Sequence, residues 1–275
     1  MWTRKRFETV LSTPVIGMVH LLPLPGSPGW GGDMGAVLAA AREDAAALAE
    51  GGVGAVMVEN YNDIPFFAGE VPPETVAAVT RASAEVQAAC GGLPLGVNVL
   101  RNDVRAALGV AAALDAAFVR VNVHTGAAVT DQGVLQGRAA ETLRARRALA
   151  PDTAILADLR VKHASPLAPR PVAEEAGDLR RRGLADAVIV TGPATGDAAD
   201  PAELGAVRAE LPDCPLLIGS GASADNLGRY LPDADGFIVG TSLKASRDGG
   251  RQRIDPGRVR TFVSACMDSM DKGLQ

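Results

Sequence analysis

The chain has 275 residues, of which 47% are hydrophobic, and it carries a formal net charge of −5 at pH 7. This is the length of one large α/β barrel domain rather than of a small module. The hydrophobic content excludes a disordered chain, and the negative charge gives no attraction for a nucleic-acid backbone. The three cysteines are far apart in the sequence and form neither a disulfide framework nor a zinc-ligand spacing.

The N-terminal segment and the hydropathy pattern predict a cytoplasmic protein that does not insert into a membrane. Residues 1–12 are basic but lead into no apolar run, which excludes an ordinary secretory signal. Arg42, Glu43, Asp44 and Glu50 interrupt the alanine-rich segment, so no stretch approaches the roughly 20 apolar residues that span a bilayer.

Eight short apolar runs alternate along the chain with eight longer segments of helical spacing. The short runs are bounded by Gly, Pro or Asp, as strands buried on both faces are. They lie at 15–20, 53–60, 94–100, 117–123, 154–159, 186–192, 215–221 and 235–242. Helices are expected at 34–50, 72–90, 101–114, 134–149, 171–183, 201–210, 223–230 and 256–270. The pattern predicts one (β/α)8 TIM barrel domain over residues 1–275, with a doubly wound open sheet as the alternative.

Polar side chains follow the predicted strands at the end of the barrel where active sites of this fold lie. All three histidines fall at or just beyond strand ends, and histidine is the natural proton carrier near neutral pH. Carboxylate and ammonium groups in the same place can exchange protons. The candidate catalytic residues are His20, Glu59, Arg120, Asn122, His124, Asp158 and Lys162.

These residues also have a purely structural interpretation. Arg120 and Asn122 alternate to the same side of their strand, so Arg120 could form a buried ion pair with Glu59 or Asp158. If Asp158 is instead catalytic, the substitution Asp158→Asn is expected to leave folding intact and to abolish turnover. A divalent metal held by Glu59, Asp158 or a histidine is left open, and no tight ligand spacing supports it.

The two last βα loops carry the small residues of a phosphate site. IGSGAS (218–223) and VGTSLK (239–244) each lead toward a predicted short helix. Small residues let backbone N–H groups approach an anion, and barrels often bind phosphate in these two loops. The candidate phosphate ligands are Gly219, Ser220, Gly221, Gly240, Thr241 and Ser242, with Lys244 as a charge partner. Simple turn chemistry is the alternative interpretation.

Two further loops are expected to cover the barrel or to contact another chain. HLLPLPGSPGWGG (20–32) is too rich in proline and glycine for a helix or a strand. YNDIPFFAGEVPPET (61–75) carries Phe66 and Phe67, which are expected to be exposed. Either loop could be a ligand lid or an oligomer contact, so a homo-oligomer is left open.

The sequence resembles the BtpA/SgcQ family over nearly its whole length. The resemblance is carried by VIGMVHLLPLPGSP, GVGAVMVENYNDIPF, GVNVLRND, FVRVNVHTGAAVTDQG, ADLRVKHASPL, VIVTGPATG, LIGSGAS and FIVGTSLK. It implies a barrel of the ribulose-phosphate-binding type. It also implies a link to accumulation of photosystem I in the cyanobacterial member, and it assigns no reaction or catalytic residue.

Two functions from different classes remain. The first is an enzyme that acts on a small phosphorylated sugar or nucleotide-like metabolite by acid–base chemistry, as an isomerase, lyase or hydrolase, with no certain cofactor. The alternative is a non-enzymatic factor for assembly or stability of photosystem I or another complex. The alternative gives no physical reason to place so many ionisable groups at a barrel end, where they are costly unless used or paired.

Overall fold

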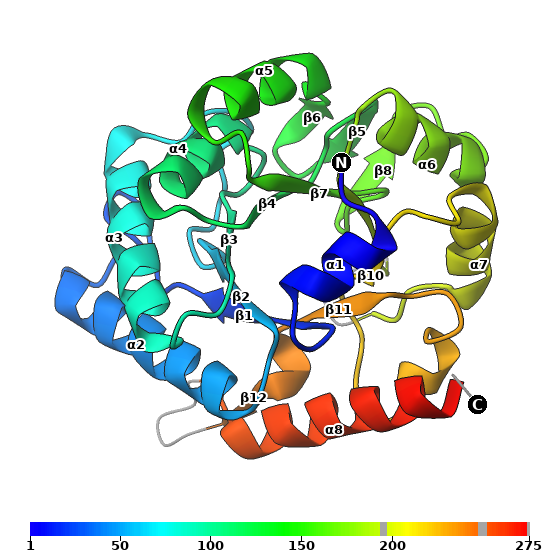
Figure 1. Cartoon of the computed structure of the whole chain (residues 1–275). Helices are drawn as coiled ribbons and strands as arrows, with labels where there is room; N and C mark the ends of the chain where they lie inside the picture. The colour runs from blue at the N-terminus through cyan, green and yellow to red at the C-terminus, as the bar shows by residue number, and fades with distance from the viewer. Residues whose placement is uncertain (193–196, 247–251, 274–275) are drawn as a thin grey trace.

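Eight parallel strands close into a barrel that is surrounded by helices (Figure 1). This computed structural model describes residues 1–192, 197–246 and 252–273. The order of the strands around the barrel is β1-β11-β10-β9-β7-β4-β3-β2. Their bounds are β1 Val15–His20, β2 Ala55–Glu59, β3 Leu95–Asn98, β4 Phe118–Val121, β7 Ala154–Asp158, β9 Ala187–Val190, β10 Leu216–Ile218 and β11 Gly236–Val239. Each lies inside one of the eight predicted runs, so the TIM barrel is confirmed and the open sheet is excluded.

Most of the expected helices are present. Their bounds are α2 Met34–Glu50, α3 Pro73–Ala89, α4 Val104–Leu114, α5 Ala139–Leu149, α6 Val172–Arg181, α7 Pro201–Glu210 and α8 Pro256–Gly273. A further helix, α1 Arg4–Val10, was not expected from the sequence. Aspartates start two of them, because the Asp103 carboxylate accepts from the Ala106 N–H at 2.9 Å and Asp200 accepts from Ala202. That residues 1–275 form one domain stays a prediction.

Two helix predictions are wrong in part. The segment expected at 134–149 begins as strand β6 (Gly133–Gln136) and becomes helical only at Ala139. The segment expected at 223–230 contains only the 3-10 turn η1 (Leu227–Arg229). In the first case the short run VLQ fits either structure, and pairing with a neighbouring strand decides it.

A small antiparallel sheet, order β6-β5-β8, joins the loop after β4 to the loop after β7. Strand β5 (Ala127–Thr130) pairs with β6 on one side and with β8 (Ala164–Pro166) on the other. A second hairpin of β12 (Lys244–Ser246) and β13 (Gln252–Ile254) follows β11. Both small sheets lie beyond the C-terminal ends of barrel strands.

Side-chain alternation along the strands separates two cores. Inward residues such as Ile16, Met57, Phe118 and Leu156 fill the inside of the barrel. Outward residues such as Val119, one position further along β4, pack against the surrounding helices. The same alternation places polar residues inward at the C-terminal ends of the strands.

Helix α1 closes the N-terminal end of the barrel. Figure 1 looks onto this end, and α1 crosses in front of the strands. Phe7 on α1 is 1% exposed and joins the inner core, together with Trp2 and Leu11. The Trp2 N–H donates to the Asp186 carboxylate at 3.0 Å, and Arg4 pairs with Asp235 at 2.6 Å. The other end, where the strands finish, is called the mouth below.

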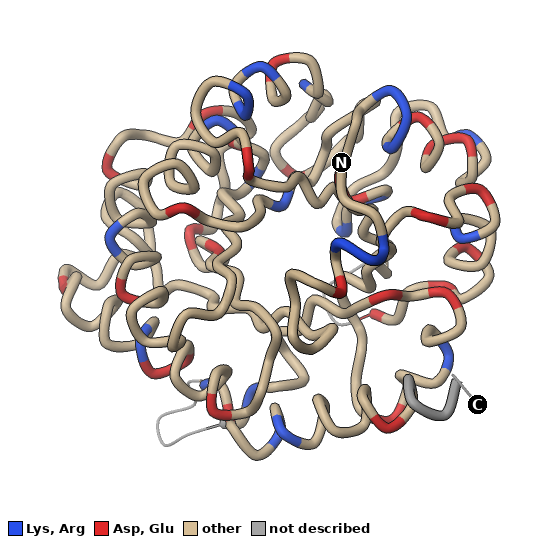
Figure 2. The backbone as a smooth tube through the Cα atoms, in the orientation of Figure 1, with Lys and Arg blue, Asp and Glu red and all other residues tan. Residues whose placement is uncertain are grey.

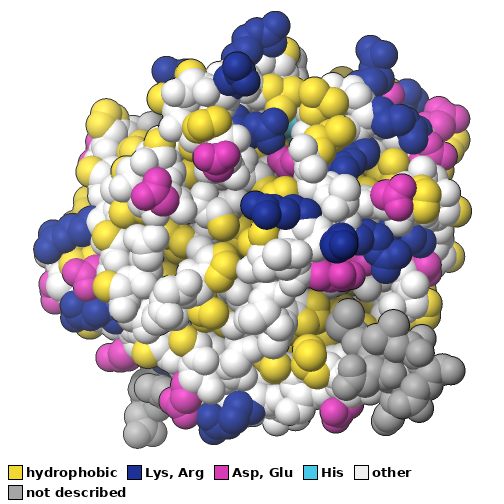
Figure 3. Space-filling model, viewed as in Figure 1, with side chains coloured by type: hydrophobic (Ala, Val, Ile, Leu, Met, Phe, Trp, Pro, Cys, Tyr) yellow, Lys and Arg dark blue, Asp and Glu magenta, His cyan; other side chains and the backbone are white. Residues whose placement is uncertain are grey.

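Charged residues of both signs are spread over the outer helices and loops (Figure 2). On the face that Figure 3 shows, basic and acidic side chains are interspersed rather than gathered by sign. Within the described residues, no helix is both long enough and apolar enough to cross a membrane. A cytoplasmic location stays a prediction.

Candidate functional site at the barrel mouth

A layer of polar side chains lies above the apolar interior of the barrel. Each follows the inward residues of its strand by an even number of positions, so the strand pleat turns it inward as well. Most of these side chains are buried, including Glu59 at 3% exposure and Arg120 at 3%. The layer contains His20, Glu59, Asn98, Arg120, Asn122, Asp158 and Thr191, and Gly219 and Gly240 take the same inward position directly after β10 and β11.

Arg120 and Asp158 form a buried ion pair at the centre of this layer. The Arg120 guanidinium donates to both Asp158 oxygens, from Nη2 at 2.9 Å and from Nε at 3.1 Å. Asn122 Nδ2 donates to Asp158 Oδ2 at 2.6 Å. Of the two ion pairs that the sequence left open for Arg120, the structure has the one with Asp158. Because Asp158→Asn would leave Arg120 buried without a counter-charge, the expectation that this variant folds normally no longer holds.

His20 lies between a lysine and a glutamate. Lys244 Nζ is 2.9 Å from His20 Nδ1, and His20 Nε2 is 3.7 Å from Glu59 Oε1. An ammonium group only donates, so Nδ1 accepts and the ring proton is on Nε2, facing Glu59. Burial and then the Lys244 charge hold the pKa of His20 well below its ordinary value. His20 is therefore a neutral hydrogen-bond donor at neutral pH.

Neighbouring side chains hold this histidine and its glutamate partner in place. Asn98 Nδ2 donates to Glu59 Oε2 at 2.6 Å. The Tyr61 ring stacks on the His20 ring with 4.4 Å between centroids and 18° between planes. Lys244 thus contacts His20 and does not line the cavity of the two phosphate loops, where the sequence placed it as a charge partner.

Lys162 reaches the same region from the loop after β7. Burial lowers the pKa of Lys162, the Glu59 charge acts against this shift, and Arg120 adds to it. Arg101, from the loop after β3, donates from Nη2 to the Lys162 carbonyl at 2.6 Å. The mouth therefore combines a carboxylate, an amine with a reduced pKa and a neutral imidazole, which are groups suited to proton transfer.

One cavity of about 380 Å³ brings the two groups of candidates together. On one side it is lined by the loops after β10 and β11, which hold all six candidate phosphate ligands, 219–221 and 240–242. On the other side it is lined by His20, Glu59, Arg120 and Lys162. This volume falls in the lower part of the range for small-molecule sites.

The residues of the phosphate loops are not equivalent. Gly219 is needed for packing, since a Cβ atom there would lie 2.5 Å from Ile189 Cγ2, and its N–H donates to the Val190 carbonyl. Ser242 Oγ donates to the Ala222 carbonyl at 2.9 Å and so links the two loops. Ser220 is 9% exposed, and its Oγ has no hydrogen-bond partner among the residues that the structure describes.

The loops do not begin regular helices, contrary to the sequence prediction. Only the three-residue 3-10 turns η1 and η2 (Thr241–Leu243) follow them. A helix N-terminus therefore does not contribute a favourable partial charge to anion binding at these loops. What supports an anion is the small residues, the unpaired Ser220 hydroxyl and the nearby cations.

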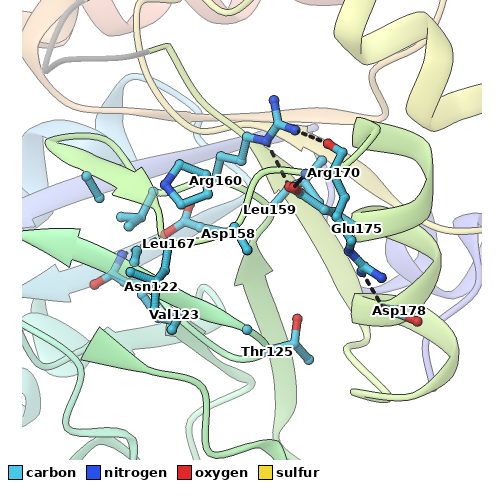
Figure 4. Close-up of a pocket in the computed structure, with 17 residues that line it drawn as sticks. Asn122, Val123, Thr125, Asp158, Leu159, Arg160, Leu167, Arg170, Glu175 and Asp178 are labelled. Carbon is cyan, nitrogen blue, oxygen red and sulfur yellow. Dashed lines mark hydrogen bonds and ion pairs between the residues drawn. The ribbon is translucent and has the colours of Figure 1, made fainter. Parts of the chain in front are cut away.

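A further cavity of about 450 Å³ lies on the outer side of Asp158, between β5, β8 and α6 (Figure 4). Ion pairs line it, with Arg160 Nε 2.8 Å from Glu175 and Arg170 Nη2 2.6 Å from Asp178. Asp158 and Asn122 line it from the barrel side. Because its charged groups pair with one another, they are not available as free partners for an anion.

The structure does not bring every histidine to the mouth cavity. His124 is 1% exposed, and its Nε2 lies 2.8 Å from the Gly183 carbonyl. The chain leaves the barrel after Val123 to form the β5–β6 hairpin, which carries His124 away from Glu59 and Lys162. His163 is exposed at the rim. Asn60 holds a loop in place, since its Oδ1 accepts from the Leu100 N–H at 2.7 Å.

The structure gives no direct support for a metal. Among residues 1–192, 197–246 and 252–273, no three His, Cys, Asp or Glu side chains converge as a metal site. Two of the proposed ligands already have partners, Glu59 with Asn98 and Asp158 with Arg120.

Two residues of the mouth were missed from the sequence. Arg101 is 4% exposed beside Lys162, and Tyr61 stacks on His20. Both follow predicted strands directly, at the end of 94–100 and of 53–60. Their place just past a strand end was therefore the available signal.

Comparison with known proteins agrees with this architecture. The model of the BtpA family matches residues 11–268. The photosystem I biogenesis protein BtpA of Synechocystis is 45% identical over 94% of this chain and 89% of its own length. An uncharacterised protein of Thermococcus kodakarensis is 47% identical over 91% of this chain and 94% of its own. Among solved structures, N-(5′-phosphoribosyl)anthranilate isomerase of Pyrococcus furiosus is similar in fold, with a TM-score of 0.55 at 13% identity and coverage of 93% and 99%.

Proposed function

The chain belongs to the BtpA family, and we propose that it is an enzyme acting on a small phosphorylated sugar or nucleotide-like metabolite at the barrel mouth. The observation that supports this most is the shared 380 Å³ cavity. There, the candidate phosphate loops face Glu59, His20 and Lys162 across one small space. A phosphate on the loops would hold the rest of the molecule against groups that can move protons.

The ionisable groups of the mouth suggest which residue would act as base, as hydrogen-bond donor and as acid. Glu59 is the candidate base, because Asn98 orients one of its oxygens and the other faces His20. Neutral His20 is the candidate donor to a developing negative charge, with Lys244 fixing its tautomer. Lys162 is the candidate acid or charge stabiliser. Isomerase, lyase and hydrolase chemistry all use such a set.

A second candidate is the non-enzymatic factor for assembly or stability of photosystem I or another complex. Exposed apolar residues at the mouth favour it, including the cross-strand pair Val129 and Val134 at 44% and 51% exposure. The 47% identical relative of Thermococcus kodakarensis is uncharacterised, so it does not itself support a role in photosystem I. A homo-oligomer formed through the loops at 20–32 or 61–75 stays a prediction.

Ligand binding separates the candidates. A thermal-shift and calorimetric screen would use inorganic phosphate, ribose 5-phosphate and nucleoside monophosphates. A bound ligand at 100 times its Kd raises the unfolding free energy by about 2.7 kcal/mol. Ser220→Asp should weaken binding at least tenfold, because its carboxylate repels the phosphate. Ser220→Ala should bind more weakly than wild type but better than Ser220→Asp.

The matched control is Ser12→Asp, which adds the same charge on an exposed residue before β1, at the opposite end of the barrel. It should bind as wild type does. Ligands that bind are then incubated with the protein and followed by ¹H and ³¹P NMR for conversion. Equal affinity of Ser220→Asp and wild type would refute the phosphate site. Binding without conversion for every ligand would count against the enzyme.

A further inference from the structure

A second cavity of about 300 Å³ opens beside the first one. Glu59, Arg120 and Lys162 line both cavities and form the boundary between them. The walls of the second cavity differ from those of the first, since they include the flat rings of Tyr61 and Phe66. A molecule held by its phosphate in the first cavity can therefore extend past Glu59 into a space with aromatic walls.

Two residues that line the second cavity, Asn122 and Arg101, each carry a buried polar atom that has no partner among the described residues. Asn122 is 4% exposed, and its Nδ2 must face Asp158, because a carboxylate paired with Arg120 only accepts. Its Oδ1 is therefore the free acceptor. Arg101 is 4% exposed, and within the described part of the chain its Nε–H has no partner, while its Nη2 donates to the Lys162 carbonyl. Unpaired buried groups of this kind are destabilising unless a ligand satisfies them.

These features define the chemistry of the ligand group that would fill the second cavity. An acceptor and an N–H donor between aromatic walls match a planar ring whose edge carries both a donor and an acceptor. A simple sugar phosphate has no planar surface to cover Tyr61 and Phe66. A nucleobase has both the surface and the polar edge. The boundary residues Glu59 and Lys162 would then lie beside the bond that joins the ring to the sugar.

We propose that the substrate is a nucleotide-like molecule, with its phosphate on the loops after β10 and β11 and a nucleobase-like ring in the second cavity beside Asn122 and Arg101. This rests on the proposed function and narrows its substrate class to phosphorylated sugars that carry a planar heterocycle. The two cavities act as separate parts of one site, so each part can be tested by itself.

The test compares the Kd of ribose 5-phosphate with that of purine and pyrimidine nucleoside 5′-monophosphates by calorimetry. Wild type should bind at least one monophosphate about tenfold more tightly than ribose 5-phosphate, since one stacked base contributes this much or more. Phe66→Ala should remove that preference and leave the Kd of ribose 5-phosphate within twofold of wild type. The matched control is Phe67→Ala, because Phe67 is 54% exposed and does not line the cavity.

The outcomes separate this inference from the proposed function. If ribose 5-phosphate binds in a Ser220-dependent way and no monophosphate binds more tightly, the ring site is overturned and the phosphate site stands. Equal effects of Phe66→Ala and Phe67→Ala would also overturn the ring site. If no phosphate ester binds, both proposals fall.

Discussion

The two ends of the barrel are formed by the same eight strands, yet they bury opposite kinds of side chain. At the N-terminal end, Phe7 of α1 packs on inward apolar residues such as Ile16 and Phe118. At the mouth, the inward positions hold Arg120 and Asp158, whose burial costs free energy unless they pair. The difference indicates that the closed end stabilises the fold, while the mouth carries the ionisable side chains that a reaction would need. Substitutions should be able to separate the two.

The largest expected effect is at the mouth ion pair. Asp158→Asn should lower the unfolding free energy by about 3–5 kcal/mol, because Arg120 stays buried without a counter-charge. The double variant Arg120→Met/Asp158→Asn should be more stable than Asp158→Asn, since no charge is left unpaired. Urea unfolding at pH 7.5 measures all variants. A loss below about 1 kcal/mol for Asp158→Asn would show that the pair is not needed for the fold.

The next effect is at the closed end. Phe7→Ala should lower the unfolding free energy by about 3 kcal/mol through the cavity that it leaves in the inner core. The same variant should bind any mouth ligand with unchanged Kd, since Phe7 lies at the opposite end of the barrel. Urea unfolding and calorimetry on one preparation give both values. A changed Kd would contradict the separation of the two ends.

The smallest effect is a pH dependence that His20 brings to the mouth. Its pKa lies well below that of an unfolded histidine, so below about pH 6.5 the unfolded chain binds the additional proton. Stability should therefore fall as the pH decreases from 6.5 toward the folded pKa. His20→Asn should flatten this slope between pH 7.5 and 5.5, measured by urea unfolding. A slope equal to that of the wild type would refute the assignment to His20.

The barrel was predictable because buried parallel strands carry an unmistakable pattern. The run AVMV in β2 is continuously apolar, Gly54 precedes it, and the polar residues Glu59 and Asn60 end it. The elements that the sequence did not predict correctly are ones that depend on tertiary contacts. Strand β6 exists only because β5 pairs with it, and α1 is a short helix held by the packing of Phe7 into the barrel.

The site was predictable only in its composition. Strand ends and alternation identified Glu59, Arg120, Asn122 and Asp158, because the pleat fixes which side chains point inward. The partners could not be predicted, since Lys244 meets His20 across 224 positions of sequence. Arg101 was missed for a different reason: it lies in a loop just past a strand end, and no periodic pattern shows in which direction a loop side chain points.

Strand β4 shows how closely function and fold share one piece of chain. Phe118, Arg120 and Asn122 stand one above another inside the barrel, while Val119 and Val121 face the helices. An evolving gene can therefore exchange Asn122 by a point substitution and alter the chemistry without disturbing Phe118 below it. A one-codon deletion between them has a different outcome, because it turns the inward set outward and the outward set inward. Along this strand, point substitutions can therefore change the chemistry and keep the fold, whereas a one-residue deletion would disrupt the fold.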